Sequence, residues 1–231
     1  MDGEWIARAR VHAVLADQHR LAVLHSFALG DRTPKQLAEL LDIPMPLLSH
    51  HLNVLADARL VSRTTSEQDG RKRFVTLNSS AFGYLNREWL RERVAAPSGR
   101  VVFACTHNSA RSVLAAALWS DRFHRPTAAG GTSPGSGIHP KAVRAARAHR
   151  LPLLQETPVA LDEVLEESDL LVTVCDAANE LVQTHPNRLH WSIPDPAASG
   201  TSQSFEQAFQ QLSQRITRLG SALSLDTEEN T

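Results

Sequence analysis

The chain has 231 residues, enough for two modest domains, and 42% of them are apolar, so each domain can bury a core. The net charge is −1, but residues 1–99 carry +2 and residues 100–231 carry −3, so any contact with nucleic acid is expected in the first half. No stretch approaches the roughly 18 apolar residues of a membrane span and the start lacks a signal-peptide core, so we expect a cytoplasmic protein without a membrane partner. Two cysteines make neither a disulfide framework nor a structural zinc site.

The first half of the chain begins with a series of predicted helices. Two helical patterns cover residues 4–15 and 18–29. A third helix has a clear start, because Thr33 can cap it, Pro34 suits its first turn and Gln36 can complete a capping box. Three leucines are expected to form its buried stripe, namely Leu37, Leu40 and Leu41.

A fourth helix and a hairpin follow. The segment LLSHHLNVLADARL predicts a helix with three leucines on one face, namely Leu48, Leu52 and Leu55. Two short helices joined by a tight turn form a helix-turn-helix pattern. The stretch LVSRTTSEQDGRKRFVTLN then predicts two strands around a turn at Asp69-Gly70. A further helical stretch, YLNREWLRERV, ends in AAPSGR (95–100), which separates two expected domains, 1–95 and 100–222.

The second half alternates strands with helices. The expected strands are VVFA (101–104), TAAGG (127–131), LLVTV around 171–174 and LHWSI (189–193), and the expected helices cover 112–123, 140–149, 161–168 and 204–220. The last helix has an apolar stripe of Phe205, Ala208, Phe209, Leu212, Ile216 and Leu219. This alternation indicates an α/β domain with a parallel four-stranded sheet and helices on both faces, and with a binding site at the carboxyl ends of its strands.

Cys105 stands where the first of these strands gives way to a helix. Backbone N–H groups converge in such a loop and the helix dipole favours an anion, so an oxyanion is expected to bind among its residues, namely Thr106, His107, Asn108, Ser109, Ala110, Arg111 and Ser112. Arg111 can grip two oxygens of that anion, and the same field favours a thiolate nucleophile at Cys105, to which Ser112 can donate a hydrogen bond. The alternative is that Cys105 is an ordinary buried residue and Arg111 a surface charge.

A second feature follows the fourth strand, at the same edge of the sheet. In WSIPDPAAS, Asp195 can act as a general acid that protonates a departing oxygen, although Asp-Pro is also a common turn. The loop CTHNSARS, the pair Asp195-Pro196 and the segment 128–143 together resemble the low-molecular-weight protein tyrosine phosphatase and arsenate reductase superfamily. This resemblance implies a flavodoxin-like domain in which Cys105 is the nucleophile, Arg111 the anion clamp and Asp195 the general acid.

The residues beside Asp195 favour a small oxyanion, arsenate or phosphate, over phosphotyrosine. Phosphatases of this type place aromatic residues after Asp-Pro, where Ala197 and Ala198 stand here. CTHNSARS is similar to the cysteine loops of arsenate reductases, in which a second thiol reduces a Cys–As(V) adduct. Cys175 is a candidate for that thiol. The alternatives are that Cys175 is structural, or that an external thiol acts: mycothiol, glutathione with a glutaredoxin, or thioredoxin. No tightly bound cofactor is expected.

Two departures from the family leave a non-catalytic oxyanion sensor as an alternative to an enzyme. Val182 stands where the thioredoxin-coupled reductases have a further cysteine, and Ala116 stands where the family often has a glutamate that helps to organise the loop.

The segment LLSHHLNVLADARLV and the hairpin after it resemble the winged helix of the ArsR/SmtB repressors, over roughly residues 8–80. This resemblance implies a homodimer, formed through the N-terminal domain, that binds double-stranded operator DNA with a recognition helix at about 46–57. Seven residues of the helix and the wing are candidates to contact DNA, namely Ser49, His50, Asn53, Arg63, Arg71, Lys72 and Arg73. The alternative is that the arginines belong to an ordinary solvated hairpin. Arg59 stands where the family usually has a glycine that ends the helix.

No metal site is expected. His50 and His51 are adjacent and point about 100° apart on a helix, and residues 1–99 contain no cysteine to match the family's Cys-x-Cys site. The sequence therefore predicts an arsenic-responsive regulator fused to an arsenate reductase. Its alternatives are a regulator whose second domain only senses oxyanion, and a low-molecular-weight tyrosine phosphatase.

Overall fold

The computed structural model describes residues 3–85 and 100–223, and the chain divides into two compact units, Met1–Leu90 and Arg91–Thr231. The helix predicted at 84–94 and the domain boundary predicted at 95–100 lie almost wholly outside the described residues. Within those residues, no helix is both long enough and apolar enough to cross a membrane.

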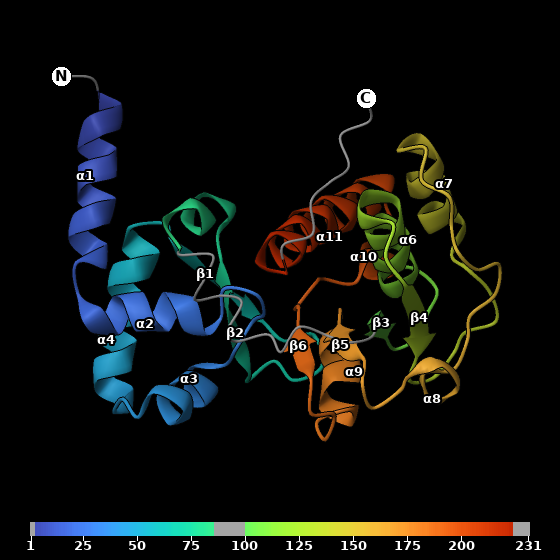
Figure 1. Ribbon diagram of the computed structural model, residues 1–231, viewed down its shortest axis with the longest axis horizontal. Coiled ribbons are helices and arrows are strands. Elements are labelled where there is room, and N and C mark those ends of the chain that lie inside the picture. Colours follow the sequence, from blue (N-terminus) through green and yellow to red (C-terminus); the bar gives the residue numbers. More distant parts are fainter. Residues whose placement is uncertain (1–2, 86–99, 224–231) are drawn as a thin grey trace. The chain divides into compact units, whose positions relative to one another are not determined.

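The first unit is made of helices and one antiparallel hairpin (Figure 1). Its elements are α1 (Gly3–Leu15), α2 (Gln18–Ser26), α3 (Pro34–Leu41), α4 (Met45–Asp57), β1 (Val61–Thr65), β2 (Arg73–Leu77) and the 3-10 helix η1 (Ser79–Tyr84). The predicted capping box is confirmed at the start of α3, where Thr33 and Gln36 each accept the other's backbone N–H. The predicted apolar face of α4, made by Leu48, Leu52 and Leu55, is buried.

Two local predictions for this unit are wrong in detail. Helix α2 ends at Ser26, and Phe27, Ala28 and Leu29, which are expected to continue it, are buried in the turn that follows. Leu40 is 48% exposed, because the burial of α3 centres on Leu37. The predicted turn at Asp69-Gly70 is confirmed: it lies in a seven-residue loop (66–72), in which the N–H of Lys72 donates to the carbonyl of Asp69.

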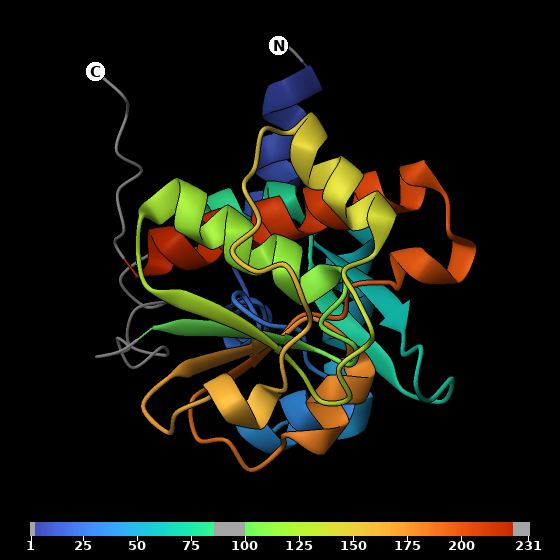
Figure 2. The ribbon, with the colours of Figure 1, turned by 90° about the vertical axis from the view of Figure 1, so that its right-hand side faces the viewer.

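The second unit is built on a four-stranded parallel sheet in the order β4-β3-β5-β6. Its elements are β3 (Val101–Cys105), α6 (Arg111–Phe123), β4 (Thr127–Gly131), α7 (Pro140–Ala148), α8 (Leu161–Val164), β5 (Leu170–Thr173), α9 (Asp176–Leu181), β6 (Arg188–His190), α10 (Pro196–Ser199) and α11 (Ser202–Ala222). Helices α6, α7 and α11 cover one face of the sheet, and α8 and α9 cover the other (Figure 2). The predicted α/β architecture is confirmed, and the apolar stripe of α11 is buried as predicted.

The strand order places a binding site at one point of this sheet. The chain leaves β3 for β4 on one side and later enters β5 on the other side, so the connections diverge at the carboxyl end of β3. Ligands of open α/β sheets bind where connections diverge in this way. Cys105 is the last residue of β3, and Cys175 follows β5 by two residues, so both thiols lie at this point of the sheet.

The turn between α4 and β1 explains the departure at Arg59. Arg59 has φ 57°, in the left-handed region, where a side chain is strained and glycine is not. Its carbonyl accepts a hydrogen bond from Nδ2 of Asn78 at 2.8 Å, which holds the turn against the end of β2. The backbone at this position would therefore suit a glycine better than an arginine.

We predict that Arg59→Gly raises the free energy of unfolding by about 0.5–1 kcal/mol, because relief of the strained φ exceeds the entropy that glycine adds to the unfolded chain. Arg59→Ala is the matched control, since it removes the same charge but keeps a Cβ. Urea unfolding followed by circular dichroism measures both variants. Equal stabilisation by alanine would show that the charge, and not the backbone, is responsible.

Candidate functional site

The cysteine loop, residues 105–111, joins the end of β3 to the start of α6 and is held by a second loop, residues 132–139. The carbonyls of Cys105, Thr106, His107 and Ser109 accept N–H groups from Thr132, Ser133, Gly135 and His139, at 3.1, 2.8, 2.9 and 2.8 Å. A planar trans peptide directs its C=O and N–H to opposite sides, so these bonds turn the following N–H groups to the other side of the loop. The cysteine loop thus presents several donors together, as an oxyanion requires.

Asn108 holds the cysteine loop from within. It is fully buried and has φ 49°, a left-handed conformation that asparagine tolerates better than most residues. Its Oδ1 accepts the backbone N–H of Val159 at 2.8 Å and Nε2 of Gln155 at 2.5 Å, and its Nδ2 donates to Oγ of Ser112 at 2.9 Å. The sequence analysis places Asn108 in the oxyanion loop but does not predict these three bonds.

Ser112 connects this asparagine to Cys105. Its Oγ lies 3.1 Å from Sγ of Cys105, and both side chains are buried. This Oγ accepts the N–H of Asn108, and its own hydrogen remains available to donate to the sulfur. A hydroxyl that donates to sulfur stabilises a thiolate, which is the role the sequence predicts for Ser112.

Arg111 and Asp195 form the other part of the site. Nη1 of Arg111 donates to the carbonyl of Ile193 at 2.8 Å, and Nη2 lies 3.5 Å from Oδ1 of Asp195. The guanidinium is nearly buried, whereas the side chain of Asp195 is 35% exposed. Asp195 also caps α10 by accepting the N–H of Ala197 at 3.1 Å, so it serves a turn as well. The structure thus brings the predicted clamp and the predicted acid together.

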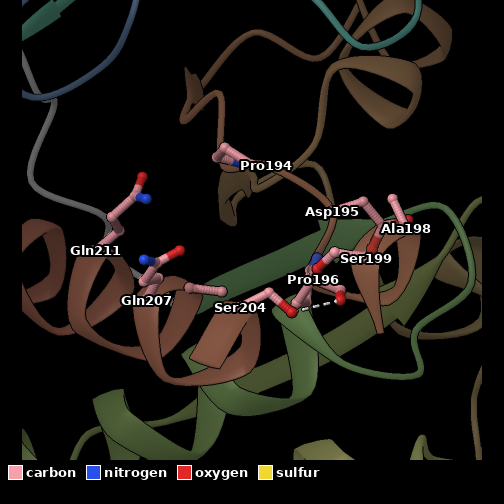
Figure 3. A pocket seen from close by; sticks show the side chains of 9 residues that line it. Pro194, Asp195, Pro196, Ala198, Ser199, Ser204, Gln207 and Gln211 are labelled. Carbon is pink, nitrogen blue, oxygen red and sulfur yellow. Dashed lines mark hydrogen bonds between the residues drawn. The ribbon is translucent and has the colours of Figure 1, made fainter. Parts of the chain in front are cut away.

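A pocket of about 260 Å³ opens beside Asp195 (Figure 3). Its lining combines prolines and small residues with polar side chains, namely Pro194, Asp195, Pro196, Ala198, Ser199, Ser204, Gln207, Ala208 and Gln211. None of these lining residues is aromatic, so none of them can stack on a phenyl ring.

Cys175 lies at the tip of β5, next to the cysteine loop. Its Sγ is 3.4 Å from Oγ1 of Thr106 and accepts the N–H of Ala178 at 3.4 Å, so it caps α9. Burial raises the pKa of the Cys175 thiol, and the charge of Arg111 opposes that shift. Both cysteines are free thiols, and the pairing of β3 with β5 brings their strand tips side by side.

The seven residues predicted to contact DNA are all exposed, on α4 and on the hairpin. The sequence did not predict that two of them bond each other. Nη2 of Arg63, on β1, donates to Oδ1 of Asn53, on α4, at 2.8 Å. This bond ties the helix to the hairpin and fixes the orientation of both side chains.

Two family models match the chain. Residues 100–229 match low molecular weight phosphotyrosine protein phosphatase, and residues 17–63 match bacterial regulatory protein, arsR family. An arsenate reductase of Brevibacillus brevis is 33% identical over 103 residues, which are 42% of this chain and 76% of that protein. Arsenate reductase 1 of Bacillus cereus is 29% identical over 124 residues, 51% of this chain and 91% of that protein. The solved structure of an arsenate reductase from Archaeoglobus fulgidus is 28% identical, with 52% of this chain and 97% of that chain covered and a TM-score of 0.47.

The second unit, with its cysteine loop at the end of the first strand of a parallel sheet, has the architecture of a small phosphatase-like domain. Because the phosphatase model covers more than half of the chain, the chain belongs to the low molecular weight phosphotyrosine protein phosphatase family. It joins an arsR-type helix-turn-helix to that domain, so both predicted resemblances are confirmed.

Gly131, the last residue of β4, lets the second loop approach the cysteine loop closely. A Cβ at this position would lie 2.8 Å from the carbonyl oxygen of Thr106 and 3.0 Å from the backbone N of Asn108.

We predict that Gly131→Ala lowers the free energy of unfolding by about 1–3 kcal/mol, because the backbone must move to admit the methyl group. Urea unfolding measures this decrease.

The matched control is Gly137→Ala in the same loop, where an added Cβ has nothing within 4 Å. We expect this variant to be as stable as the parent protein or more so. If both variants are destabilised equally, the close approach at Gly131 is not the reason.

Proposed function

We propose that the second unit is a thiol-dependent arsenate reductase and that the first unit binds operator DNA as a dimer. The observation that carries the first part is the hydrogen bond of Ser112 to Cys105, in a loop that ends at the Arg111–Asp195 pair. This arrangement combines a nucleophile, a cationic clamp and an acid. The names of the relatives, arsenate reductases of Brevibacillus brevis and Bacillus cereus, support the choice of arsenate.

The first chemical step joins arsenic to Cys105. The thiolate attacks the arsenic of bound arsenate, so an S–As bond forms and an As–O bond breaks. Asp195 gives its proton to the departing oxygen, which leaves as water. Arg111 and the N–H groups of the loop balance the negative charge on the remaining oxygens. Ala197 and Ala198, which follow Asp195-Pro196, offer no aromatic ring to stack on a phenyl group, which favours a bare oxyanion over phosphotyrosine.

The second step reduces arsenic. A second thiolate attacks the sulfur of Cys105, an S–S bond forms, and the electron pair of the broken S–As bond passes to arsenic. As(V) becomes As(III) and leaves as arsenite. Cys175 is our candidate for this thiol, because its Sγ lies 3.4 Å from Oγ1 of Thr106, which follows Cys105 in the cysteine loop. An external thiol then reduces the disulfide between Cys105 and Cys175.

We predict that the reduced protein, freed of small thiols and mixed with arsenate, makes about one arsenite per chain and loses both thiols. Cys105→Ser should make none, because a serine hydroxyl stays protonated where a thiolate does not. Cys175→Ser should make none in this single turnover. Arsenite analysis and intact mass spectrometry measure product and thiol state together.

Added thiols separate the remaining possibilities. If the parent protein makes arsenite only with an external thiol, Cys175 is not the resolving thiol, although the enzyme proposal holds. If no thiol system gives arsenite, the enzyme proposal fails. Hydrolysis of p-nitrophenyl phosphate would then identify a phosphatase, and tight arsenate binding without turnover would identify a sensor.

The exposed residues of α4 and the hairpin support the DNA-binding part of the proposal. Ser49, His50 and Asn53 lie on the helix that would enter the major groove, and the bond of Arg63 to Asn53 orients one of them. Residues 1–99 contain no cysteine, so an arsenic signal that thiolates read must enter through Cys105 or Cys175. We propose that occupancy of the second unit alters the affinity of the first unit for its operator.

We predict that replacing Arg71, Lys72 and Arg73 by alanine weakens operator binding and flattens its salt dependence, by about 0.9 log unit of slope for each phosphate that the variant no longer neutralises. The control replaces three exposed arginines of the second unit, Arg125, Arg144 and Arg147, and so removes the same charge. Fluorescence anisotropy with labelled operator at several salt concentrations measures both. An unchanged slope in the hairpin variant would show that DNA binds elsewhere.

A further inference from the structure

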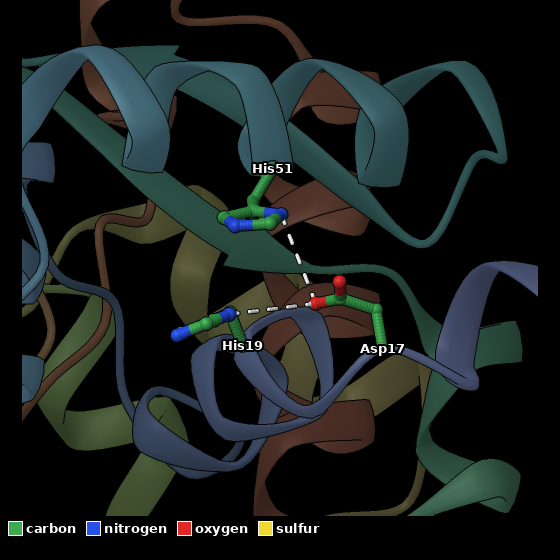
Figure 4. A group of neighbouring side chains, drawn as sticks. All are labelled: Asp17, His19 and His51. Atoms are coloured by element: carbon green, nitrogen blue, oxygen red, sulfur yellow. Dashed lines mark ion pairs between the residues drawn. The ribbon is translucent and has the colours of Figure 1, made fainter.

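Three residues that can ligate a metal meet in the first unit, where no metal site is expected from the sequence. Asp17 caps α2, His19 lies in the first turn of α2, and His51 lies in the middle of α4. Their ligand atoms all lie within 4.8 Å of one another. Nδ1 of His51 is 3.8 Å and Nδ1 of His19 is 4.0 Å from the same oxygen, Oδ1 of Asp17, and Figure 4 shows both rings turned toward it.

The burial of His51 is the independent observation that points to a ligand. The residue is 4% exposed, and among the described residues neither of its ring nitrogens has a hydrogen-bond partner. The nearest carboxylate oxygen, at 3.8 Å, is too far for a hydrogen bond. Buried polar groups are almost always satisfied, since an unsatisfied one costs about 1–3 kcal/mol. A cation between His51 and Asp17 would satisfy one of these nitrogens.

The three groups supply the donor atoms that a metal needs. Each imidazole can offer a nitrogen lone pair, and the carboxylate offers an oxygen. The rings of His19 and His51 stack with centroids 5.3 Å apart. Two imidazoles and one carboxylate therefore face one point.

The neighbouring groups limit the site to one ion. The guanidinium of Arg20 lies 3.8 Å from the other oxygen of Asp17 and opposes a second cation. His50 is the other histidine beside His51, and the centroids of their rings are 5.7 Å apart. The side chain of His19 is 42% exposed, which gives an ion a path from solvent and leaves a position for water.

The ligand types and distances select the class of metal. Two imidazoles and a carboxylate suit zinc and its neighbours, whereas calcium and magnesium take oxygen ligands and arsenite takes thiolates. Tetrahedral zinc, with ligands at about 2.0–2.1 Å, separates them by about 3.3 Å. The observed separations are wider, at 3.8 and 4.0 Å from Asp17 and within 4.8 Å over the whole set, so the side chains would have to rotate toward one another to bind an ion.

We propose that Asp17, His19 and His51 form a binding site for one divalent transition-metal ion of the zinc class. The ion would clamp the start of α2 to the middle of α4. Because α4 is the helix proposed to read DNA, the clamp would make the position of that helix depend on metal. The site itself uses no residue of the second unit and stands whether or not that unit reduces arsenate.

Cobalt(II) tests the site, because tetrahedral Co²⁺ absorbs visible light and hydrated Co²⁺ barely does. The full-length protein carries Cys105→Ser and Cys175→Ser, so that neither thiolate can bind the ion. We expect one Co²⁺ per chain and its displacement by Zn²⁺. Neither arsenic nor DNA is present, so this result is independent of the proposed function.

Variants in the same background locate the ion. His19→Ala, His51→Gln and Asp17→Ser should each weaken Zn²⁺ binding at least about tenfold, the decrease seen even when an outer partner of a ligand is removed. Serine keeps the cap of α2 while it removes the carboxylate. His12→Ala, a histidine of the same unit outside the cluster, should bind as the parent does.

Circular dichroism checks that each variant is folded. If His51→Gln does not fold, the Zn²⁺ affinity of His19→Ala becomes the deciding measurement, because the side chain of His19 is partly exposed. The absence of saturable Co²⁺ absorption in the parent would overturn the proposal. Parent-like binding in His19→Ala, or equally weakened binding in His12→Ala, would overturn it as well.

Discussion

The hydrogen bonds of Asn108 are the constraint on which the reactive site depends. Its amide oxygen is fixed by the N–H of Val159, so its NH₂ must face Ser112. The hydroxyl of Ser112 is then left to face the sulfur of Cys105. One buried asparagine thus sets the direction of every bond up to the nucleophile. Gln155 adds a second hydrogen bond to the amide oxygen of Asn108 and so strengthens this arrangement.

The sequence predicts the sheet and its reactive edge because both follow from local patterns. The apolar runs predict the bounds of β3 and β4 to within a residue. The polar loop after β3 identifies Cys105 and Arg111 as candidate site residues. The bonds of Asn108 are different, because Gln155 and Val159 are 47 and 51 residues away along the chain. Helices α9 and α10 have six and four residues, too few for a helical period to be read, and α8 ends earlier than predicted. The cluster around His51 could not be predicted for the same reason, because its members are far apart in the sequence. Asp17 and His19 lie at the start of α2, whereas His51 lies in α4.

Parallel pairing explains how two cysteines 70 residues apart in the sequence come to lie at one edge of the sheet. Strands β3 and β5 end at the same edge, so the residues just beyond them are neighbours. Their surroundings nevertheless differ. Cys105 faces the hydroxyl of Ser112, in a loop that leads into the 13-residue helix α6. Cys175 is buried, and that burial raises its pKa. The two thiols therefore meet at one edge of the sheet in different surroundings: Cys105 has a hydroxyl beside its sulfur, and Cys175 caps a short helix.

The two units also differ in the ligands that they offer. Both thiols of the chain belong to the second unit, whereas the cluster in the first unit consists of imidazoles and a carboxylate. Arsenite prefers thiolate ligands, whereas zinc-like ions also bind imidazoles and carboxylates well. Each ligand would therefore select its own unit by chemistry alone, without competition for donors. Under linkage, any effect that either ligand has on DNA affinity must be matched by an equal effect of DNA on the affinity for that ligand. Under our two proposals, arsenic and a divalent metal therefore bind at separate sites, one in each unit, with different donor atoms.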